Sequence, residues 1–492
     1  MTTTRTFDSA RLERVFVLGL GLSGAAATRL LRRRGIGVVA SDRRSAAEIG
    51  ADDLANDPGV ELRLGDRSAE LPSGLDALVT SPGVSLDHPL LRRAAELGVP
   101  VIAEVELAWS FLVGSDATQA TVVGITGSNG KSTTTAMAGA LLAGAGFAVE
   151  VCGNIGRPLA AVVDGPPGRY FVVELSSFQL ETIVRFRPRA AALLNISPDH
   201  LDRHGDLAGY LAAKQRIFRN QGPGDVAVLN ADEPEVAASP TAAARRFFSG
   251  ATAGSAGSDT AGTFSGAGCR LAGDRVVECS DGQDGEFLFA RHDLALPGLH
   301  NVENAMAAAL LSRAVGAPAA AIAPALAAFR GLPHRVERVA EVGGVAFVDD
   351  SKGTNVAATA RSLEGFADAS VHVVLGGRNK GADFRFLREI VARKARRAYL
   401  IGESAADLER ALAGAVECER AETLPVAVAM AAAAARPGET VLLSPACASF
   451  DQFRDYVDRG RQFAALARGL AASASGLAAA GAPLSALPGG GR

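Results

Sequence analysis

Short runs of consecutive apolar residues recur along the chain, and most of them end in glycine or in polar residues. They lie at residues 14–18, 121–125, 170–173, 190–194, 226–229, 345–348, 371–375 and 441–443. Continuous rather than alternating apolar character is typical of strands that are buried on both faces, as in parallel sheets. Because ligands of such sheets bind beyond the carboxyl ends of the strands, the residues that follow each run are candidates for a binding site.

A helical pattern covers residues 207–219. The residues on its apolar stripe, at spacings of three and four, are Leu207, Tyr210, Leu211, Lys214, Ile217 and Phe218. A lysine therefore lies on the apolar stripe. The pattern by itself favours a snorkelling Lys214, with its methylenes buried and its ammonium in water. A chemically modified lysine, or a charge within a site, is the alternative.

The chain has 492 residues, which is too many for one ordinary core and suggests about three domains. A polar break at 114–116 and the sequence Gly-Leu-Pro at 331–333 mark the joints. Ala, Gly, Ser and Thr dominate 236–268, which predicts a flexible surface insertion. The predicted organisation is 1–115, 116–331 and 332–468, with a disordered tail at 469–492.

Charge and cysteine content narrow the class of protein. The 50 basic and 53 acidic side chains give a net charge of −3, so no general attraction to nucleic acid or to an anionic membrane is expected. The five cysteines are scattered without CxxC spacing, which indicates reduced thiols rather than disulfides or a zinc site. Acidic residues interrupt the basic region before the apolar run near the N-terminus, which argues against a secretion signal. We expect a cytoplasmic, monomeric enzyme that acts on small molecules.

A glycine-rich turn at residues 127–130 lies between an apolar run and a predicted helix that begins with Lys131. Small residues let backbone N–H groups close around phosphates, and the helix N-terminus adds positive potential. Lys131 supplies a mobile charge and Ser132 a hydroxyl for Mg²⁺. The spacing departs from the usual pattern, because Ile125 occupies the first glycine position and Gly124 lies one residue earlier. We predict a triphosphate site related to the common P-loop; the alternative is a glycine-rich turn with an incidental lysine.

A GxGxxG pattern at residues 19–24 follows the first apolar run and opens a predicted helix. The next strand ends in Asp42, which could meet a ribose hydroxyl. Such a turn seats a diphosphate, and the pattern does not distinguish a nicotinamide dinucleotide from a UDP-sugar. Glycines needed only for close helix–strand packing are the third possibility. The turn at 80–83 follows another strand and lies at the same edge of the sheet.

Candidate metal ligands follow two strands of the central unit. Glu174 ends one of them, where a carboxylate can bind Mg²⁺ or cap the next segment. After the other, Ser197 and Pro198 suit the N-cap and first position of a helix, which would place His200 in its first turn. The pattern leaves open whether His200 is a ligand or a structural residue.

The third unit repeats this arrangement. Polar, small or cationic groups follow three of its strands, at 349–355, 376–380 and 444–450. Cations and hydroxyls at three aligned strand ends suit an anionic substrate, whereas any one of them alone could be ordinary loop chemistry.

Ten segments between residues 14 and 468 resemble, in order, the motifs of the Mur ligase family. They are GITGSNGKSTTT, CGNIG, ELSSFQLE, SPDHLDRH, AAKQRIF, LPGLHNVENA, GLPHR, DDSKGTN, LGGRNKGADF and SPACASFDQF. The last two are most similar to the versions in the enzymes that add D-glutamate. The resemblance implies an α/β fold of three domains: a Rossmann-like UDP-binding domain, a central P-loop ATPase domain with a mostly parallel sheet, and a C-terminal Rossmann-like domain.

The resemblance also implies roles for particular residues. The UDP-substrate would contact Leu22, Ser23, Asp42, Arg44, Thr80, Ser81, Pro82, Gly83 and Asn154. ATP would contact Gly127, Ser128, Asn129, Gly130, Lys131, Ser132, Thr133, Asn301, Arg335 and Asp350. One Mg²⁺ would bind Ser132 and Glu174, and a second would bind His200 and a carbamylated Lys214. D-Glutamate would contact Lys352, Thr354, Lys380, Ser449, Phe450 and Tyr456. Phe450 and Tyr456 stand where Leu and Phe are common in the family, which affects the shape of that pocket.

The implied reaction is ATP-dependent addition of D-glutamate to UDP-N-acetylmuramoyl-L-alanine through an acyl phosphate, as a step of peptidoglycan precursor synthesis. The implied catalytic residues are Lys131, Glu174, His200, Lys214 and Arg335. Three alternatives have less support. A folate-polyglutamate ligase would not need the GxGxxG unit. An NAD-dependent oxidoreductase would leave Lys131, Glu174 and His200 without a role, and a non-catalytic nucleotide sensor would not need the downstream acids and cations.

Overall fold

The computed structural model describes residues 7–49, 52–65, 70–113, 120–250, 266–280, 283–296, 298–379 and 381–479. It contains three sheets, and the chain divides into two compact units. The first unit comprises residues 1–295 and 299–329, and the second comprises 296–298 and 330–492. The three-domain α/β fold expected from the sequence is confirmed. The boundaries at 115, 331 and 468 stay predictions.

The first sheet is fully parallel in the order β3-β2-β1-β4-β5. Its strands are β1 (Arg14–Leu18), β2 (Gly37–Asp42), β3 (Val60–Leu64), β4 (Ala77–Thr80) and β5 (Val101–Ala103). Its helices are η1 (Ser9–Arg11), α1 (Leu22–Arg33), α2 (Ala46–Ile49), α3 (Asp52–Ala55), α4 (Pro89–Glu96) and α5 (Glu104–Val113). In β1, Val15 and Val17 pack in one core and Phe16 and Leu18 in another, so both faces are buried. Strands β2 and β3 lie on one side of β1 and strands β4 and β5 on the other, so the strand order switches between β1 and β4, which is where such sheets bind ligands.

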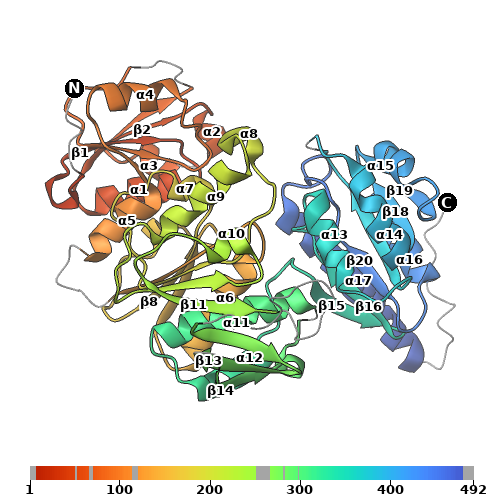
Figure 1. Ribbon diagram of the computed structural model, residues 1–492. Coiled ribbons are helices and arrows are strands. Elements are labelled where there is room, and N and C mark those ends of the chain that lie inside the picture. The colour runs from red at the N-terminus through yellow and green to blue at the C-terminus, as the bar shows by residue number, and fades with distance from the viewer. Residues whose placement is uncertain are drawn as a thin grey trace. The chain divides into compact units, whose positions relative to one another are not determined.

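The second sheet has nine strands in the order β14-β13-β12-β11-β10-β9-β6-β8-β7. They are β6 (Thr121–Thr126), β7 (Val149–Gly153), β8 (Tyr170–Glu174), β9 (Ala190–Leu193), β10 (Val226–Asn230), β11 (Ala244–Ser249), β12 (Gly268–Ala272), β13 (Arg275–Ser280) and β14 (Gln283–Ala290). Pairing is parallel from β7 to β12 and antiparallel through β13 and β14. Figure 1 labels β8, β11, β13 and β14 of this sheet. The P-loop strand β6 lies between β8 and β9, so the polar residues after these two strands reach the same edge.

Helices cover both faces of the second sheet. They are α6 (Lys131–Gly144), η2 (Leu159–Ala161), α7 (Ser177–Leu180), α8 (Leu201–His204), α9 (Leu207–Gln215), η3 (Arg216–Phe218), α10 (Pro234–Ala237), η4 (Arg291–Asp293), α11 (Leu299–Ala314), η5 (Ala319–Ala321) and α12 (Ile322–Ala328). The prediction of a flexible insertion at 236–268 is wrong for its described part, because β11 pairs with β10 and β12. Phe248 of β11 is buried, which the small-residue composition of the segment did not indicate. Residues 251–265 lie outside the described residues.

The third sheet has the order β15-β16-β20-β17-β18-β19 and is parallel except for β15. Its strands are β15 (Glu337–Val342), β16 (Val345–Asp349), β17 (Val371–Gly376), β18 (Ala395–Ile401), β19 (Cys418–Glu422) and β20 (Thr440–Leu443). Its helices are α13 (Val356–Glu364), η6 (Phe384–Leu387), α14 (Arg388–Lys394), α15 (Ala405–Leu412), α16 (Leu424–Ala434) and α17 (Tyr456–Ala479). Helix α17 continues into the segment 469–492 that composition predicted as disordered, because its alanines permit helix after the packed part ends. Residues 480–492 lie outside the described residues.

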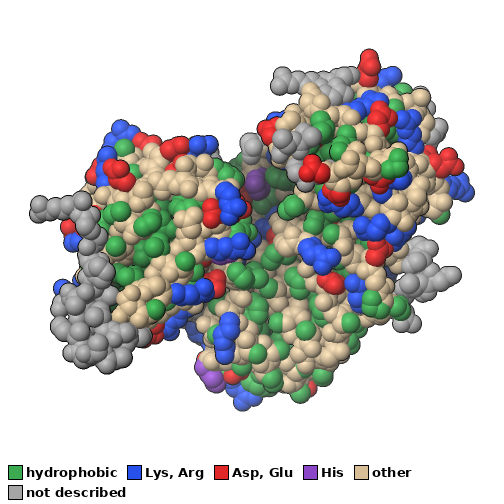
Figure 2. Space-filling view, turned by 180° about the vertical axis from the view of Figure 1, so that it is seen from behind, with side chains coloured by type: hydrophobic (Ala, Val, Ile, Leu, Met, Phe, Trp, Pro, Cys, Tyr) green, Lys and Arg blue, Asp and Glu red, His purple; other side chains and the backbone are tan. Residues whose placement is uncertain are grey.

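The surface agrees with the small net charge. Acidic and basic side chains are interspersed over much of the face shown in Figure 2. Within the described ranges, every helix is too short or too polar to span a lipid bilayer.

Candidate functional site

The glycine-rich turn after β6 has the geometry of a phosphate-binding loop. Gly130 is the N-cap of α6 with φ +78°, a left-handed conformation that glycine adopts without strain. A Cβ at Gly130 would overlap the side-chain oxygen of Asn304, so the position also requires glycine for space. The turn therefore presents backbone N–H groups at the start of a 14-residue helix.

The residues that follow β9 hold this loop in place through hydrogen bonds. The Asn129 N–H donates to Asn195 Oδ1 at 2.8 Å, and Asn195 Nδ2 donates back to the Asn129 carbonyl at 3.1 Å. Ser128 Oγ donates to the Ser197 carbonyl at 3.1 Å. Asn195 was not among the residues that sequence reasoning assigned to the site. The sequence feature that could have identified Asn195 is its position directly after an apolar run, at the sheet edge where the P-loop strand also ends.

Two lysines converge on one carbonyl of the loop. Lys131 Nζ and Lys214 Nζ each donate to the Gly127 oxygen at 2.8 Å. Lys131 also donates to the Ser128 carbonyl at 2.8 Å. Lys131 beside the backbone N–H groups of the loop forms a place that favours an anion.

The snorkelling interpretation of Lys214 is wrong. Its side chain is only 1% exposed, and the ammonium lies 4.3 Å from the centre of the Tyr210 ring instead of reaching water. Burial, followed by the charge of Lys131, lowers the pKa of Lys214 to about 6. The amine is therefore mostly neutral at pH 7. The predicted helix at 207–219 is also shorter, because α9 ends at Gln215 and η3 follows it.

Glu174 meets the requirements of a metal ligand. It ends β8 beside Ile125 of β6. Its Oε1 accepts from Asn154 Nδ2 at 2.9 Å, whereas its Oε2 is buried without a hydrogen-bond partner among the described residues. A buried carboxylate oxygen without a donor is costly unless a cation supplies the partner. The donor set therefore fits Mg²⁺, with the buried Ser132 hydroxyl in the first turn of α6.

The prediction that a helix begins at Ser197 and Pro198 is wrong about where the helix starts. Helix α8 begins at Leu201, and His200 is its N-cap with φ +52°. The His200 ring packs edge-on against Phe178 at 4.8 Å and lies 3.5 Å from an Asp199 oxygen, with about half of its side chain exposed. The local turn at His200 replaces the first helical turn, so the imidazole remains accessible.

In the first sheet, the switch between β1 and β4 brings two predicted segments together. Ser81 Oγ donates to the Gly19 carbonyl at 2.6 Å, and the Ser81 N–H donates to the Leu18 carbonyl at 2.9 Å. Gly24 packs so closely against Gly19 that a Cβ there would overlap the Gly19 carbonyl. Leu22 is 79% exposed at the start of α1, and Ser23 is half-buried beside it. The turn 80–83 thus lies against the glycine-rich loop.

Asp42, which the sequence offered as a contact for a ribose, makes hydrogen bonds within its own part of the fold. Its Oδ2 accepts from the Leu20 N–H at 2.6 Å, and both oxygens accept from the Arg44 guanidinium at 2.8–2.9 Å. Burial acts to raise its pKa, but the hydrogen bonds from Arg44 and Leu20 outweigh it and lower the pKa to about 2. Asp42 therefore fixes the glycine-rich loop and Arg44 in place.

Asn301 lies on α11, which packs against α6. Its Oδ1 accepts from Asn304 Nδ2 at 3.3 Å, and Asn304 Oδ1 accepts from Thr134 of α6 at 3.2 Å. The structure thus brings Asn301 to the P-loop helix through Asn304, a residue that sequence reasoning missed.

The remaining predicted residues belong to the second unit. Asp350 is buried, accepts from Ser362 Oγ at 2.6 Å and Ser444 Oγ at 2.7 Å, and burial raises its pKa to about 6. Lys352 Nζ lies 5.6 Å from the centre of the Tyr456 ring. Ser449 is buried and Phe450 is 61% exposed. The others are Arg335, which is half-buried, Thr354, which is also half-buried, and Lys380, which lies outside the described residues.

Beneath these strand ends, Arg459 makes contacts that the sequence did not indicate. Its guanidinium is fully buried and donates to the Ser351 carbonyl at 3.0 Å and the Cys447 carbonyl at 3.1 Å. Burial lowers its pKa to about 10. Arg459 thereby ties the loop after β16 to the loop after β20.

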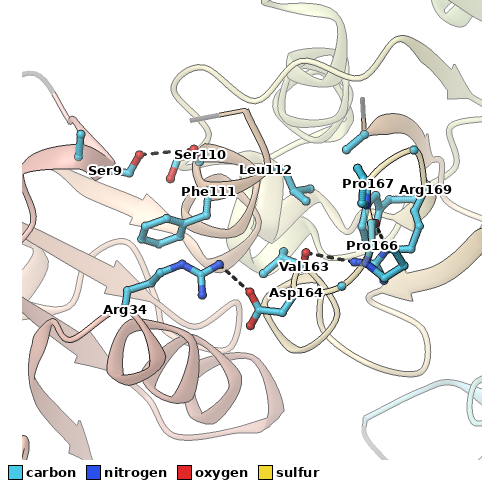
Figure 3. Close-up of a pocket in the computed structure, with 15 residues that line it drawn as sticks. Ser9, Arg34, Ser110, Phe111, Leu112, Val163, Asp164, Pro166, Pro167 and Arg169 are labelled. Carbon is cyan, nitrogen blue, oxygen red and sulfur yellow. Dashed lines mark hydrogen bonds and ion pairs between the residues drawn. The ribbon is translucent and has the colours of Figure 1, made fainter. Parts of the chain in front are cut away.

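A pocket of about 350 Å³ lies elsewhere in the first unit, and none of the predicted site residues line it. Figure 3 shows that its cations have partners: Arg34 donates to Asp164 and Arg169 to the Val163 carbonyl, at 2.6 and 3.1 Å. Arg169 also donates to the Val162 carbonyl at 3.1 Å. Because these cations already have protein acceptors, the pocket offers little to an anionic substrate.

Comparison with known proteins matches the whole arrangement. Family models match as the Mur ligase MurD-like N-terminal domain at 13–103, the Mur ligase middle domain at 125–312 and the Mur ligase glutamate ligase domain at 334–447. The UDP-N-acetylmuramoylalanine–D-glutamate ligases of Acidobacterium capsulatum and Anaeromyxobacter dehalogenans are 43% and 46% identical to this chain. Each alignment covers 92% of this chain, with 96% and 97% of the relatives.

Solved structures share the fold at lower identity. The UDP-N-acetylmuramate-alanine ligase MurC of Thermotoga maritima aligns with a TM-score of 0.58 at 19% identity, over 93% of this chain and 100% of its own. A pseudomurein peptide ligase type C of Methanothermus fervidus aligns with a TM-score of 0.52 at 19% identity, over 88% and 96%. These structures share the fold, and the family models with the curated relatives show that the chain belongs to the Mur ligase family.

Proposed function

We propose that this chain is the ATP-dependent ligase that joins D-glutamate to UDP-N-acetylmuramoyl-L-alanine in peptidoglycan precursor synthesis. The observation that carries the ATP-dependent step is the edge of the second sheet. There the P-loop, two convergent lysines and the unpartnered oxygen of Glu174 come together. The choice of substrates rests on the names of the curated relatives, which match nearly the whole chain.

The reaction needs an activated carboxylate, because a carboxylate itself is a poor electrophile. The terminal carboxylate of the UDP-substrate forms a bond to the γ-phosphorus of ATP, and ADP leaves. The amine of D-glutamate then attacks the acyl carbon, phosphate leaves, and the amine loses a proton. Mg²⁺ would neutralise the transferring phosphoryl group.

The residues of the first unit divide these tasks. Lys131 would leave the loop carbonyls to contact the β- and γ-phosphates, while the N–H groups of 127–133 cradle them. Ser132 and Glu174 would hold one Mg²⁺, and Asn301 would contact ATP. Asn154 already contacts Glu174 and would orient the substrate arm.

A second Mg²⁺ would bind His200 and a carbamate on Lys214. The low pKa of Lys214 supports this proposal, because only a neutral amine reacts with CO₂. An ammonium offers no acceptor to a cation, whereas a carbamate offers anionic oxygens. The group is buried, so its new charge would be stable only beside a metal ion.

Substrate contacts are proposed for two further sets of residues. The UDP part would bind at residues 22–23, Arg44 and 80–83, held in register by Asp42. In the second unit, Arg335 and Asp350 would contact ATP, and the residues assigned to D-glutamate would bind its carboxylates. The proposal needs no second subunit, so a monomer stays a prediction. A cytoplasmic location is likewise part of the proposal.

Phosphate release from ATP tests the proposal. We expect release that requires UDP-N-acetylmuramoyl-L-alanine, D-glutamate and Mg²⁺ together, and one amide product per phosphate. Release with a folyl-glutamate substrate instead would indicate the folate-type ligase. Reduction of NAD⁺ would contradict the assignment of the first sheet to a UDP-sugar.

A further inference from the structure

The side chain of Arg203 joins three segments of the first unit. Its Nε and Nη2 donate to the Glu181 carboxylate at 3.2 and 2.5 Å, and its Nη1 donates to the Pro82 carbonyl at 3.1 Å. The face of the guanidinium stacks on the Phe178 ring at 4.3 Å. Only 17% of the side chain is exposed, so the geometry is fixed by packing as well as by hydrogen bonds.

These segments belong to two different parts of the site. Pro82 lies in the turn after β4, next to Ser81, which is bonded to the glycine-rich loop. Phe178 lies on α7 and contacts the His200 ring at 4.8 Å. Arg203 itself lies on α8, which starts directly after His200. One guanidinium therefore connects the turn that would hold the UDP-substrate to the segment that would hold a metal ion.

Arg203 differs from a cation that binds substrate, because its charge is already paired within the protein. Its charge is matched by Glu181, whose side chain is 8% exposed, and its third direction is occupied by a backbone carbonyl. Arginine suits this position because a planar fork can donate in two directions while its face stacks on a ring. Lysine keeps the charge but cannot make the three contacts at once.

We propose that Arg203 is a positioning residue for the ligation: it holds the Pro82 turn against the His200 segment so that the substrate carboxylate meets the γ-phosphate. This inference rests on the proposed function. A small misplacement of the turn would leave ATP binding intact and would lower the rate with the UDP-substrate, since rates fall steeply with misalignment of reacting atoms.

The decisive variants are Arg203→Lys and Glu181→Gln, with Arg187→Gln as the matched control. Arg187 also pairs with a carboxylate, that of Asp225 at 2.7 Å, but on a surface with no predicted site residue. For Arg203→Lys we expect kcat/KM for the UDP-substrate to fall about 10- to 100-fold. The KM for ATP should change less than about twofold, and Arg187→Gln should match the wild type in both.

Amide hydrogen exchange of the free protein gives a second readout that does not depend on activity. In Arg203→Lys, peptides covering residues 78–88 should exchange faster than in the wild type, and peptides covering the P-loop should not change. Glu181→Gln, which weakens the hold on Arg203, should shift the same peptides in the same direction by a smaller amount.

Three results would overturn the inference: an Arg203→Lys enzyme with kcat/KM within twofold of the wild type, unchanged exchange at 78–88, or equal losses for ATP and the UDP-substrate. The last would indicate a general structural role. A wild-type chain that does not ligate at all would remove the proposed function instead, so the two failures are distinguishable.

Discussion

At the scale of single residues, burial decides what a lysine in this site can do. Lys214 and Lys131 share one acceptor, the Gly127 carbonyl, but Lys214 is buried whereas Lys131 is partly exposed. Burial lowers the pKa of Lys214 to about 6. Lys131 keeps access to the open side of the loop with part of its side chain exposed. The two side chains therefore suit different tasks: one carries charge to a phosphate, and the other can be modified.

Lys214→Arg should be inactive. Arginine keeps a positive charge but cannot form a carbamate, and its larger head does not fit the buried site. Lys214→Ala should regain partial activity when short-chain carboxylates are added, because they can occupy the vacated space and offer oxygens to Mg²⁺. Phosphate release measures both effects. An active Lys214→Arg enzyme, or an unmodified amine in the ATP–Mg²⁺ complex by mass spectrometry, would contradict the carbamate.

Lys131→Ala should abolish ligation while calorimetric binding of the UDP-substrate stays nearly unchanged. Removal of a charged donor from a phosphate clamp costs about 3–4 kcal/mol of transition-state stabilisation, or a rate loss of about 10²–10³-fold. The first sheet, where the UDP part is proposed to bind, does not include the P-loop. Loss of UDP-substrate binding in this variant would argue against separate sites.

At the scale of elements, helix α17 approaches the strand ends of the third sheet so closely that one position has no room for a side chain. Gly460 lies within the helix, where a Cβ would overlap His334 Nδ1, Asp349 Oδ2 and Ser351 Oγ. These atoms are themselves organised, since His334 Nδ1 lies 2.7 Å from Asp349 Oδ2. His334, Glu337 and Asp349 also place possible ligand atoms near one another, but their direct contacts explain the cluster without an ion.

Gly460→Ala should lower the thermal stability of the protein and weaken ligation, because the methyl group must displace the His334–Asp349 pair or the helix. Gly469→Ala in the same helix is the matched control. It has no atom near its Cβ position and should be neutral or stabilising by up to about 1 kcal/mol, from helix propensity. Thermal melts of both variants measure the difference. Equal melting temperatures would show that the helix can shift at no cost.

At the scale of the whole molecule, two buried carboxylates on α5 join the first sheet to the second within one compact unit. Glu106 accepts from three consecutive N–H groups, those of Val184, Arg185 and Phe186, at 2.8–2.9 Å. Glu104 Oε1 accepts from the Ala160 N–H at 2.6 Å, and its Oε2 is buried without a partner among the described residues. This junction fixes the predicted UDP-substrate region relative to the P-loop.

Burial raises the pKa of Glu104 to about 7, partly opposed by the Ala160 hydrogen bond. The pKa of Glu104 in the folded state exceeds its ordinary value of 4.5. Protonated Glu104 therefore contributes fully to the free energy of unfolding below pH 4.5, and this contribution is lost as the pH rises through about 7. Glu104→Gln should therefore melt at the same temperature as the wild type near pH 4 and several degrees higher near pH 8.5. Glu96→Gln, at an exposed ion pair on α4, controls for the change in net charge. Parallel melting curves of wild type and Glu104→Gln across this range would show that Glu104 does not titrate in the folded protein.

The sequence by itself determined the α/β class, the buried strands that precede the candidate site residues, the P-loop and the family. These depend on local features: β1 is an unbroken apolar run, and Gly130 occupies a conformation that its neighbours in sequence already require. Such features act over a few residues and are therefore visible in the chain. The start of α8 was predicted wrongly because His200 adopts a left-handed conformation instead of continuing a helix. The strand β11 was missed because small residues dominate the composition of the segment around it.

The tertiary structure decided what the side chains contact. Lys214 meets the Gly127 carbonyl from 87 residues away, and Arg203 meets the Pro82 carbonyl from 121 residues away. Asp42 contacts the glycine-rich loop, and Glu104 is buried between two sheets. Desolvation and hydrogen-bond pairing depend on which distant segments pack together, and no local pattern of apolar and polar residues specifies that packing.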